Sequence, residues 1–482
     1  MTGQSIKGVE ETQRRVEQGL LPEAPLRSQV VTPQTLAARM ALLDVPGVSV
    51  AVIADGELAW ARGYGVRQAG ESAPVTEQTL FQAASISKPT TAVAVMRLVQ
   101  EGRLDLDEDV QAYLRSWGIP ANGDWQPHIT LRQLLSHTAG ATIHGFPGYR
   151  RDHVLPTLQQ VLDGAAPANT GPIRVNTVPG GQFRYSGGGT SIVQQLLMDV
   201  TGQPFPVLMR DLVLAPLGME HSTYEQPLPR ERWSEAASGH CYGGGTVDGA
   251  WHVYPEMAAA GLWTTPTDLA RLALEVQAVR AGRPGKVLTR ASVDTMLVAQ
   301  AGGPVGIGFF IEGEGAHLRF GHGGSNEGFK CQLVAYAELG LGAAIMTNAD
   351  PGWQVGAEVL GAIARAYNWL LGPKDQIGFF APPRHPAADV GSPDEAYAGD
   401  YALRPDFPVR VARTDTRLTL QLPGQPPLAL LSSSGTEYYA EALDVEVIFR
   451  RDEAGRVGSL VLRQNGSDLE ARRVPDAAEG GR

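Results

Sequence analysis

The segment FQAASISKPTTAVAV, residues 81–95, contains a serine and a lysine three positions apart, Ser85 and Lys88. Side chains at positions i and i+3 of a helix lie on the same face, so the hydroxyl and the amine can touch. A lysine can take the proton of a serine when burial or a neighbouring cation lowers its pKa toward neutrality. The spacing therefore predicts a serine nucleophile with a lysine base, although one S-x-x-K in a chain of this length can also arise by chance.

The residues around this pair predict that Ser85 lies at or very near the N-terminus of a helix. Apolar residues recur after it at helical spacing, at Ala92, Val95, Met96 and Val99. Gly102 then ends the run. Pro89 fits only the first turn of a helix, because deeper in a helix a proline removes a hydrogen bond and clashes with the preceding turn. The positive potential of a helix N-terminus would stabilise an oxyanion formed at Ser85. Ser87 adjoins Lys88 and is expected to face another side of the helix.

Two other segments place a side chain capable of proton transfer among glycines. Tyr185 lies in VPGGQFRYSGGGTSIVQQLL, and a phenol can act as a base only if nearby cations lower its pKa from about 10. His322 lies in FGHGGSNEGFKCQLVAY, where two glycines let another backbone approach closely. A histidine there could polarise a proton-transfer network or bind substrate. Taken separately, each residue is better explained by packing against a glycine turn.

The composition argues against several classes of function. The 482 residues carry a formal net charge of −11, which argues against nucleic acid and anionic membranes as partners. The two cysteines, Cys241 and Cys331, cannot form a disulfide framework, and we expect both to be small buried side chains. No C-x-x-C or H-E-x-x-H spacing suggests a metal site, so we expect neither a metal nor another cofactor. The sequence has no apolar run long enough for a membrane helix and no secretory signal at its start, so we expect a cytoplasmic protein.

The alternation of apolar and polar residues predicts the elements that must position these side chains. Residues 48–53 and 58–64 flank an Asp-Gly turn and are predicted to form a hairpin. Helices are predicted at residues 130–136, 190–201, 205–214 and 267–279, and strands at residues 319–322, 330–336 and 342–348. After about residue 370 a segment rich in proline and alanine precedes short alternating stretches, which suit a small antiparallel barrel or sandwich. These stretches are residues 409–412, 418–422, 428–431, 445–450 and 459–463.

The three segments that contain the candidate reactive residues occur in the order SISK (85–88), YSG (185–187) and HGG (322–324). In this order they resemble the motifs of the serine β-lactamase and penicillin-binding-protein superfamily. The closest branch is that of the class C β-lactamase-like serine hydrolases, which includes D-aminopeptidases, D-Ala-D-Ala peptidases and esterases. ITLRQLLSHTAGA, LAPLGMEHSTY and AAAGLWTTPTDLARLAL also resemble landmarks of this family. The resemblance extends over about residues 35 to 370.

The resemblance implies an α+β fold of the β-lactamase type, in which an antiparallel five-stranded sheet is flanked by helices and joined to a helical lobe. The C-terminal region, opening EAYAGDYAL, resembles the lipocalin-like β domain of some D-aminopeptidase-type members, which implies a small antiparallel β-barrel. We therefore expect a leader helix in residues 1–30, a β-lactamase-like hydrolase domain over 31–375, a linker over 376–394 and a lipocalin-like domain over 395–478.

The resemblance also implies roles for individual residues. Ser85 would be the acylated nucleophile and Lys88 its proton partner. Tyr185 would act as general base and then as acid toward the leaving group, and His322 would take the position of the cation in the third motif. His137 and His144 could be proposed as triad histidines. Because His137 belongs to a landmark that is usually structural in the family, neither is assigned a catalytic role.

The oxyanion hole would consist of the backbone N–H groups of Ser85 and Ser325, and Gly187, Gly323 and Gly324 would line the substrate site. Two positions depart from the family pattern. Gly187 replaces the asparagine of Y-x-N, which in the family helps to hold the lysine and contacts the substrate amide. A histidine replaces the lysine of K-T-G, and a mostly neutral imidazole holds a substrate carboxylate less well.

These departures favour an enzyme that cleaves carboxylic esters or small amides and peptides, including those of D-amino acids, with little or no β-lactamase activity. The expected partner is thus a small-molecule substrate. Two alternatives remain open at this stage. The same acyl-enzyme could pass its acyl group to an alcohol or amine, as in an acyltransferase. The fold could also serve a penicillin-binding-like binding or assembly protein with weak turnover, a reading that Gly187 favours.

Overall fold

The computed structural model describes residues 6–22, 32–122, 124–369 and 393–474, the last range with gaps at 405–406, 415–416, 422–426, 441–445, 453 and 465–466. The chain divides into two compact units. The first combines residues 1–20 with 33–370, and the second combines residues 21–32 with 371–482. Most of the predicted linker, residues 376–394, lies outside the described residues.

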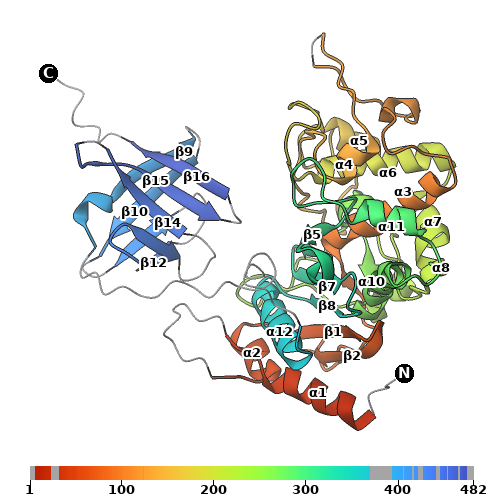
Figure 1. The fold of residues 1–482 in the computed structure, drawn as a ribbon, viewed down its shortest axis with the longest axis horizontal. Helices are drawn as coiled ribbons and strands as arrows, with labels where there is room; N and C mark the ends of the chain where they lie inside the picture. The colour runs from red at the N-terminus through yellow and green to blue at the C-terminus, as the bar shows by residue number, and fades with distance from the viewer. Residues whose placement is uncertain are drawn as a thin grey trace. The chain divides into compact units, whose positions relative to one another are not determined.

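An antiparallel sheet of six strands forms the centre of the first unit, in the order β2-β1-β8-β7-β6-β5 (Figure 1). Its strands are β1 (Gly47–Ala54), β2 (Glu57–Gly65), β5 (Phe310–Glu312), β6 (Arg319–Asn326), β7 (Phe329–Tyr336) and β8 (Gly342–Thr347). Asp55 and Gly56 join β1 to β2 with φ angles of 54° and 70°, as a tight hairpin turn requires. The sheet has one strand more than the five expected, because the short β5 pairs with β6.

Helices cover both faces of this sheet. α10 (Pro266–Arg280) packs against β1, β2, β7 and β8, whereas α12 (Gly352–Ala366) packs against β7 and β8 and in turn contacts α1 (Ile6–Gln18) (Figure 1). Every residue of β1, β7 and β8 is buried, as expected for strands covered on both faces. α2 (Leu36–Leu42) is tied to α12 by a buried ion pair of 2.6 Å between Arg39 and Glu358.

The helical lobe is organised around α3 (Ser87–Gln100), the helix predicted to follow Ser85. Ala92, Val93, Ala94 and Val95 of α3 have no exposed surface, so this helix is buried on all sides. The other helices of the unit are α4 (Leu131–Leu135), α5 (Leu158–Asp163), α6 (Gly187–Thr201), α7 (Phe205–Met209), α8 (Ala215–Leu217), α9 (Met257–Ala260) and α11 (Arg290–Met296). The helix predicted over 205–214 is divided, because its second half is a π-helical turn, Arg210–Leu214.

The second unit contains a closed antiparallel barrel of eight strands, in the order β10-β11-β12-β13-β14-β15-β16-β9. Its strands are β9 (Gly399–Arg404), β10 (Phe407–Arg413), β11 (Leu418–Gln421), β12 (Leu428–Ser432), β13 (Glu437–Ala440), β14 (Glu446–Arg451), β15 (Val457–Gln464) and β16 (Ser467–Arg473). Inward-facing side chains such as Tyr401, Val411 and Leu460 fill its core. The α+β class, the helix-flanked antiparallel sheet and the C-terminal barrel are thus confirmed.

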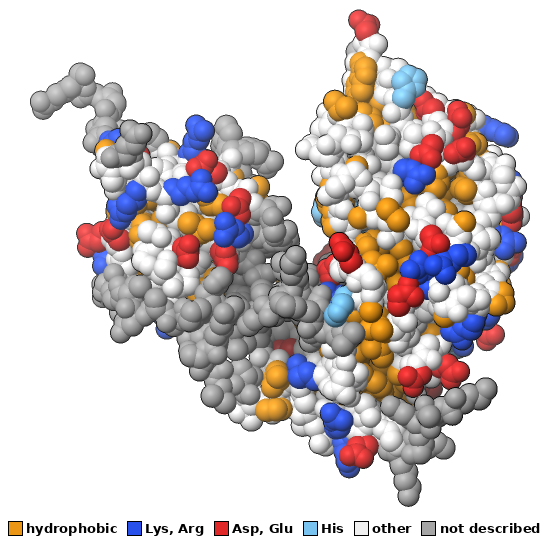
Figure 2. All heavy atoms as spheres, in the orientation of Figure 1, with side chains coloured by type: hydrophobic (Ala, Val, Ile, Leu, Met, Phe, Trp, Pro, Cys, Tyr) orange, Lys and Arg blue, Asp and Glu red, His pale blue; other side chains and the backbone are white. Residues whose placement is uncertain are grey.

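The surface carries charges of both signs. On the face shown in Figure 2, basic and acidic side chains are interspersed over the first unit, with apolar side chains between them. None of the described helices is both long and apolar enough to cross a membrane.

Candidate active site

Ser85 lies in a short 3₁₀ turn, Ala84–Ile86, and the α-helix α3 begins two residues later at Ser87. Pro89 therefore falls in the first turn of α3, where its missing N–H removes no helical hydrogen bond. Just before the turn, β3 (Phe81–Gln82) pairs with β4 (Trp263–Thr264) and fixes the direction of the chain. Ala84 has a φ of +49°, a conformation that side-chain-bearing residues rarely adopt. The residue before the predicted nucleophile is thus held in an unfavourable conformation by its surroundings.

Lys88 contacts the predicted nucleophile directly. Its Nζ donates a hydrogen bond of 3.0 Å to Ser85 Oγ and one of 2.8 Å to the main-chain oxygen of Ala259 on α9. The lysine is 4% exposed, and burial lowers its pKa to about 7. No carboxylate forms an ion pair with Lys88 in the part of the chain that the structure describes, so no opposite charge counteracts this effect. A substantial fraction of Lys88 is therefore a neutral amine at pH 7.

Ser87, the other serine beside Lys88, has a structural role. Its Oγ donates a hydrogen bond of 2.6 Å to the carbonyl of Ala84 and accepts one of 3.0 Å from the N–H of Leu262. These two bonds tie the 3₁₀ turn to the segment that follows α9. The lysine bonds to Ser85 and not to Ser87, so the geometry pairs it with the first of the two serines.

Tyr185 lies next to the serine–lysine pair, just before α6. Burial raises the pKa of Tyr185, and hydrogen bonding to the Ser85 side chain lowers it by a smaller amount. The Nζ of Lys88 lies 5.1 Å from the centroid of the tyrosine ring. Ser186 is the N-cap residue of α6, and its Oγ accepts a hydrogen bond of 2.9 Å from the N–H of Gly189. Because its pKa is raised, Tyr185 is a protonated phenol at neutral pH.

His322 approaches the same group from β6. Its ring centroid lies 6.0 Å from that of Tyr185 and 5.0 Å from that of Phe310. Burial and the nearby Lys88 cation lower the pKa of His322 to about 3, so the imidazole is neutral at pH 7. Its Nδ1 donates to the carbonyl of Gly323, and within the described residues its buried Nε2 has no hydrogen-bond partner. This nitrogen is therefore an acceptor.

The two glycines after His322 allow close packing on β6. A side chain at Gly324 would place its Cβ 2.2 Å from the carbonyl oxygen of Ala83, which directly precedes the 3₁₀ turn. A Cβ at Gly323 would lie 2.8 Å from the ring of Trp353. The missing side chain at 324 thus lets the turn with Ser85 pack directly against β6. Ser325 follows this contact and is exposed, and its place in an oxyanion hole stays a prediction.

Gly187 is the first residue of α6 and is buried. Its N–H donates a hydrogen bond of 2.9 Å to the carbonyl of His144. A Cβ at this position would lie 3.1 Å from that carbonyl oxygen and 3.1 Å from the ring of Phe146. The segment around His144 and Phe146 therefore occupies the space that a larger residue 187 would need.

The structure brings together Ser85, Lys88, Tyr185 and His322, and it adds neighbours that the sequence did not reveal. The hydrogen bond from Lys88 to the main-chain carbonyl of Ala259 could not be predicted, because every residue has such a carbonyl. Gly323 indicates that another group packs closely against β6, but the sequence does not show that this group is Trp353. Of the two cysteines, Cys331 is buried as expected, but Cys241 is only partly buried, so the expectation for Cys241 is wrong. Among the described residues, no group of His, Cys, Asp and Glu is arranged to hold a metal ion.

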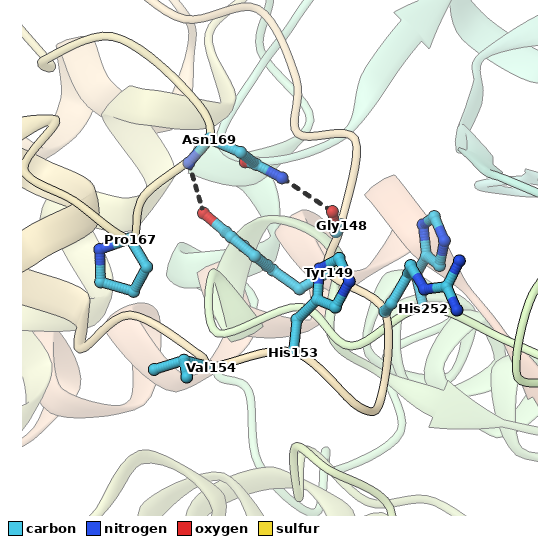
Figure 3. A pocket seen from close by; sticks show the side chains of 8 residues that line it. Gly148, Tyr149, His153, Val154, Pro167, Asn169 and His252 are labelled. Atoms are coloured by element: carbon cyan, nitrogen blue, oxygen red, sulfur yellow. Dashed lines mark hydrogen bonds between the residues drawn. The ribbon is translucent and has the colours of Figure 1, made fainter.

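The first unit also contains a pocket of about 410 Å³, and neither Ser85 nor Lys88 lines it (Figure 3). It is lined by Gly148, Tyr149, Arg150, His153, Val154, Pro167, Asn169 and His252. The N–H of Asn169 donates to the hydroxyl of Tyr149 at 3.0 Å, and its side-chain amide donates to the carbonyl of Gly148 at 2.8 Å (Figure 3). These bonds fix the wall of the pocket. Neither bond involves Ser85 or Lys88.

Family models match both units of the chain. A model described as "Beta-lactamase" matches residues 33–368, and one described as "Domain of unknown function (DUF3471)" matches residues 387–473. The chain therefore belongs to the beta-lactamase family, and the resemblance to the superfamily of serine β-lactamases and penicillin-binding proteins is confirmed. This is a family of serine hydrolases.

Individual relatives resemble the chain over most of its length. "Penicillin-binding protein 4*" of Bacillus subtilis (strain 168) is 25% identical over 437 residues, which cover 87% of this chain and 93% of that protein. The crystal structure of SurE shares 24% identity at a TM-score of 0.60 and covers 91% of this chain and 97% of its own. D-amino acid amidase from Ochrobactrum anthropi SV3, in complex with L-phenylalanine amide, shares 21% identity at a TM-score of 0.56, with 74% of this chain and 99% of that chain covered. These two structural likenesses show the fold.

Proposed function

We propose that this protein hydrolyses carboxylic esters or small amides and peptides through an acyl-enzyme on Ser85. The observation that carries the proposal is the 3.0 Å hydrogen bond between Lys88 Nζ and Ser85 Oγ, made by a lysine whose pKa is lowered to about 7. A buried lysine that is partly neutral at pH 7 can accept a proton, which an ordinary surface lysine cannot.

In the proposed acylation, the Lys88 amine takes the proton of Ser85 while Oγ forms a bond to the substrate carbonyl carbon. The resulting oxyanion would be bound by the backbone N–H groups of Ser85 and Ser325. When the bond to the leaving group breaks, Tyr185 gives its phenolic proton to that group and regains one from the Lys88 ammonium. This assignment follows from the pKa directions, because the raised pKa of Tyr185 makes it a proton donor and a poor initial base.

In the proposed deacylation, a water molecule replaces the leaving group. Lys88 accepts the proton of the water as its oxygen attacks the acyl carbon, and the proton then returns to Ser85 Oγ as the ester bond breaks. The enzyme ends in its starting state, so water is the only co-reactant. An alcohol or amine in place of the water would give the acyltransferase alternative.

The neutral state of His322 favours a substrate that has no negative charge where it meets the third motif. An imidazole whose pKa is lowered to about 3 offers no positive charge to a substrate carboxylate at pH 7. Esters and amides, including amides of D-amino acids, need no such charge. The D-amino acid amidase among the structural neighbours agrees with this class of substrate.

The hydrogen bonds of Lys88 weaken the case for a protein without turnover. Gly187 favoured that reading because an asparagine there would help to hold the lysine. In this structure the carbonyl of Ala259 is a direct hydrogen-bond partner of the lysine, and no side chain at 187 is involved.

Intact-mass spectrometry tests the proposal. The protein is treated with a p-nitrophenyl ester, an organophosphonate and a penicillin, and a Ser85→Ala variant is treated in parallel. We expect the ester and the phosphonate to leave covalent adducts on the unmodified protein and none on the variant. If none of the three reagents forms an adduct, the proposal is wrong and the binding-protein alternative gains support. A screen of p-nitrophenyl esters against D- and L-aminoacyl anilides then defines the substrate.

A further inference from the structure

Aromatic rings surround the proposed proton donor Tyr185. The ring centroid of Tyr185 lies 4.3 Å from that of His137, 4.9 Å from that of His144 and 6.0 Å from that of His322. Phe310 lies at 6.3 Å in a stacked orientation. His137 and His322 are 3% and 2% exposed, whereas His144 is exposed. Among the three histidines against this phenol, His144 is therefore the one whose side chain is open to solvent.

The backbone around His144 is fixed to the start of α6. The carbonyl of His144 accepts from the N–H of Gly187 at 2.9 Å, and the carbonyl of Ile143 accepts from the N–H of Gly188 at 3.0 Å. The hydroxyl of Ser186 donates to the carbonyl of Thr142 at 2.7 Å. Because three consecutive residues of the α6 terminus hold this segment, the position of His144 beside Tyr185 is set by the scaffold.

The groups that face His144 favour its neutral form. Partial burial and the Lys88 cation lower the pKa of His144, and His137, His322 and Tyr185 add no negative charge. In the part of the chain that the structure describes, no carboxylate forms an ion pair with His144. A neutral imidazole has one N–H donor and one acceptor nitrogen, so it can serve both polar atoms of an amide group.

We propose that His144 is a specificity-determining residue that binds the amide or amine group of the substrate next to the bond attacked by Ser85. The proposal rests on the function proposed above and adds the preferred substrate class. A site with a hydrogen-bonding group discriminates strongly against analogues that lack the matching polar atom. His144 would therefore favour aminoacyl amides and peptides over simple alkyl esters, which have no N–H.

Two substrates and three variants test this inference. The substrates are a D-aminoacyl p-nitroanilide, which carries an amine and an amide N–H, and p-nitrophenyl acetate, which carries neither. The variants are His144→Ala, His144→Gln and, as a matched control, His153→Ala, which removes an exposed histidine that lines the separate pocket. The kcat, KM and pH profile are measured for each combination.

For His144→Ala we expect kcat/KM for the anilide to fall about tenfold, mainly through KM, as the loss of one hydrogen bond predicts. The value for the acetate should stay within about twofold, as should both values for His153→Ala. His144→Gln should restore part of the anilide activity, because a carboxamide also donates and accepts. It should also remove the acid-side titration of the imidazole from the anilide profile.

The outcomes separate the inference from the proposed function. Failure of both substrates to acylate Ser85 in the unmodified protein would overturn both proposals. Suppose that the unmodified protein is acylated normally. If His144→Ala then lowers kcat/KM equally for both substrates, His144 has only a structural role beside Tyr185. If His144→Ala leaves the reaction with the anilide unchanged, His144 has no role. Either of these two results overturns the inference about His144 and leaves the serine hydrolase standing.

Discussion

The side-chain amine of Lys88 donates a hydrogen bond of 2.8 Å to the main-chain carbonyl of Ala259, which lies 171 residues further along the chain. The bond ties α3 to α9 and orients the lysine beside Ser85. A carboxylate in this place would raise the pKa of the lysine through its charge, whereas a carbonyl holds the amine without supplying a full negative charge. Orientation and a lowered pKa are therefore compatible in this site.

Replacing Lys88 by arginine should abolish the reaction. A guanidinium keeps its proton at any pH at which proteins are folded, so it cannot act as the base. We expect the rate of Ser85 acylation to fall by about 10²–10⁴-fold, the usual contribution of a general base. The burst of p-nitrophenol in stopped-flow measurements gives this rate, and thermal unfolding checks the fold. A variant with more than a tenth of the normal rate would show that the base is another group.

The acylation rate should depend on pH through the same lysine. Because the neutral amine is the reactive form, the rate should rise with pH through about 7 and level off above it. The imidazole of His322, with a pKa lowered to about 3, should add no titration between pH 5 and 9. A profile of burst rate against pH measures both features. A rate that is flat from pH 5 to 9 would contradict the assignment of Lys88.

The free energy of unfolding should also depend on pH through Lys88. The pKa of Lys88 is lowered from 10.5 to about 7 on folding, so between these values the unfolded chain binds more protons and stability rises with pH. From pH 7 to 9 the free energy of unfolding should rise by about 2 kcal/mol relative to a Lys88→Met variant, since one pKa unit corresponds to about 1.4 kcal/mol. Urea titrations at both pH values test this difference. Ser85→Ala keeps the lysine and should behave like the unmodified protein.

Tyr185→Phe should separate substrates by their leaving groups. An aniline or amine must be protonated as it leaves, whereas p-nitrophenolate leaves readily as an anion. We expect kcat/KM to fall by about 10²–10³-fold for an anilide and by less than about tenfold for a p-nitrophenyl ester. Steady-state kinetics with the same acyl group on both leaving groups gives the comparison. Equal losses on both would place the phenol in attack by Ser85 and not in departure.

Gly324→Ala should disrupt the contact between β6 and the 3₁₀ turn. The new Cβ would lie 2.2 Å from the carbonyl oxygen of Ala83, and a main-chain atom cannot move aside cheaply. We expect a loss of about 1–3 kcal/mol in stability together with a large loss of activity. Gly245→Ala, at a glycine with open space around it, is the matched control and should change neither. Chemical denaturation and ester hydrolysis measure the two effects.

The sequence predicted which helices and strands surround the site, but it predicted the residues at which they begin and end less well. Helix α6 was expected from residue 190, but it begins at Gly187, because the carbonyls of Ile143 and His144 bind the N–H groups of two glycines that rarely start a helix on their own. Ser85 was expected at or very near the start of the α-helix, and it lies in a 3₁₀ turn just before that helix, held by a hydrogen bond from the N–H of Leu262 to Ser87 Oγ. A local pattern does not contain partners as distant as Leu262.

The chemical state of the site also lay beyond the sequence. The motifs identified Ser85, Lys88, Tyr185 and His322 as a group, but a pKa depends on burial, which a sequence does not specify. The structure makes Lys88 partly neutral and Tyr185 protonated, so the proposed base is the lysine. From the sequence, His144 was considered only as a triad histidine, because its contact with Tyr185 is formed only when its segment binds the start of α6.

The ring of eight strands in the second unit has a further consequence for the behaviour of the chain in a crowded solution. Among the described residues, each strand from β9 to β16 has a hydrogen-bonded neighbour on both sides, so the closed barrel has no edge strand of the kind that ends an open sheet. Edge strands of this kind recruit strands from other molecules and can seed aggregation. Because the strand order closes, the eight strands of this unit are less open to such pairing than the edge strands of an open sheet.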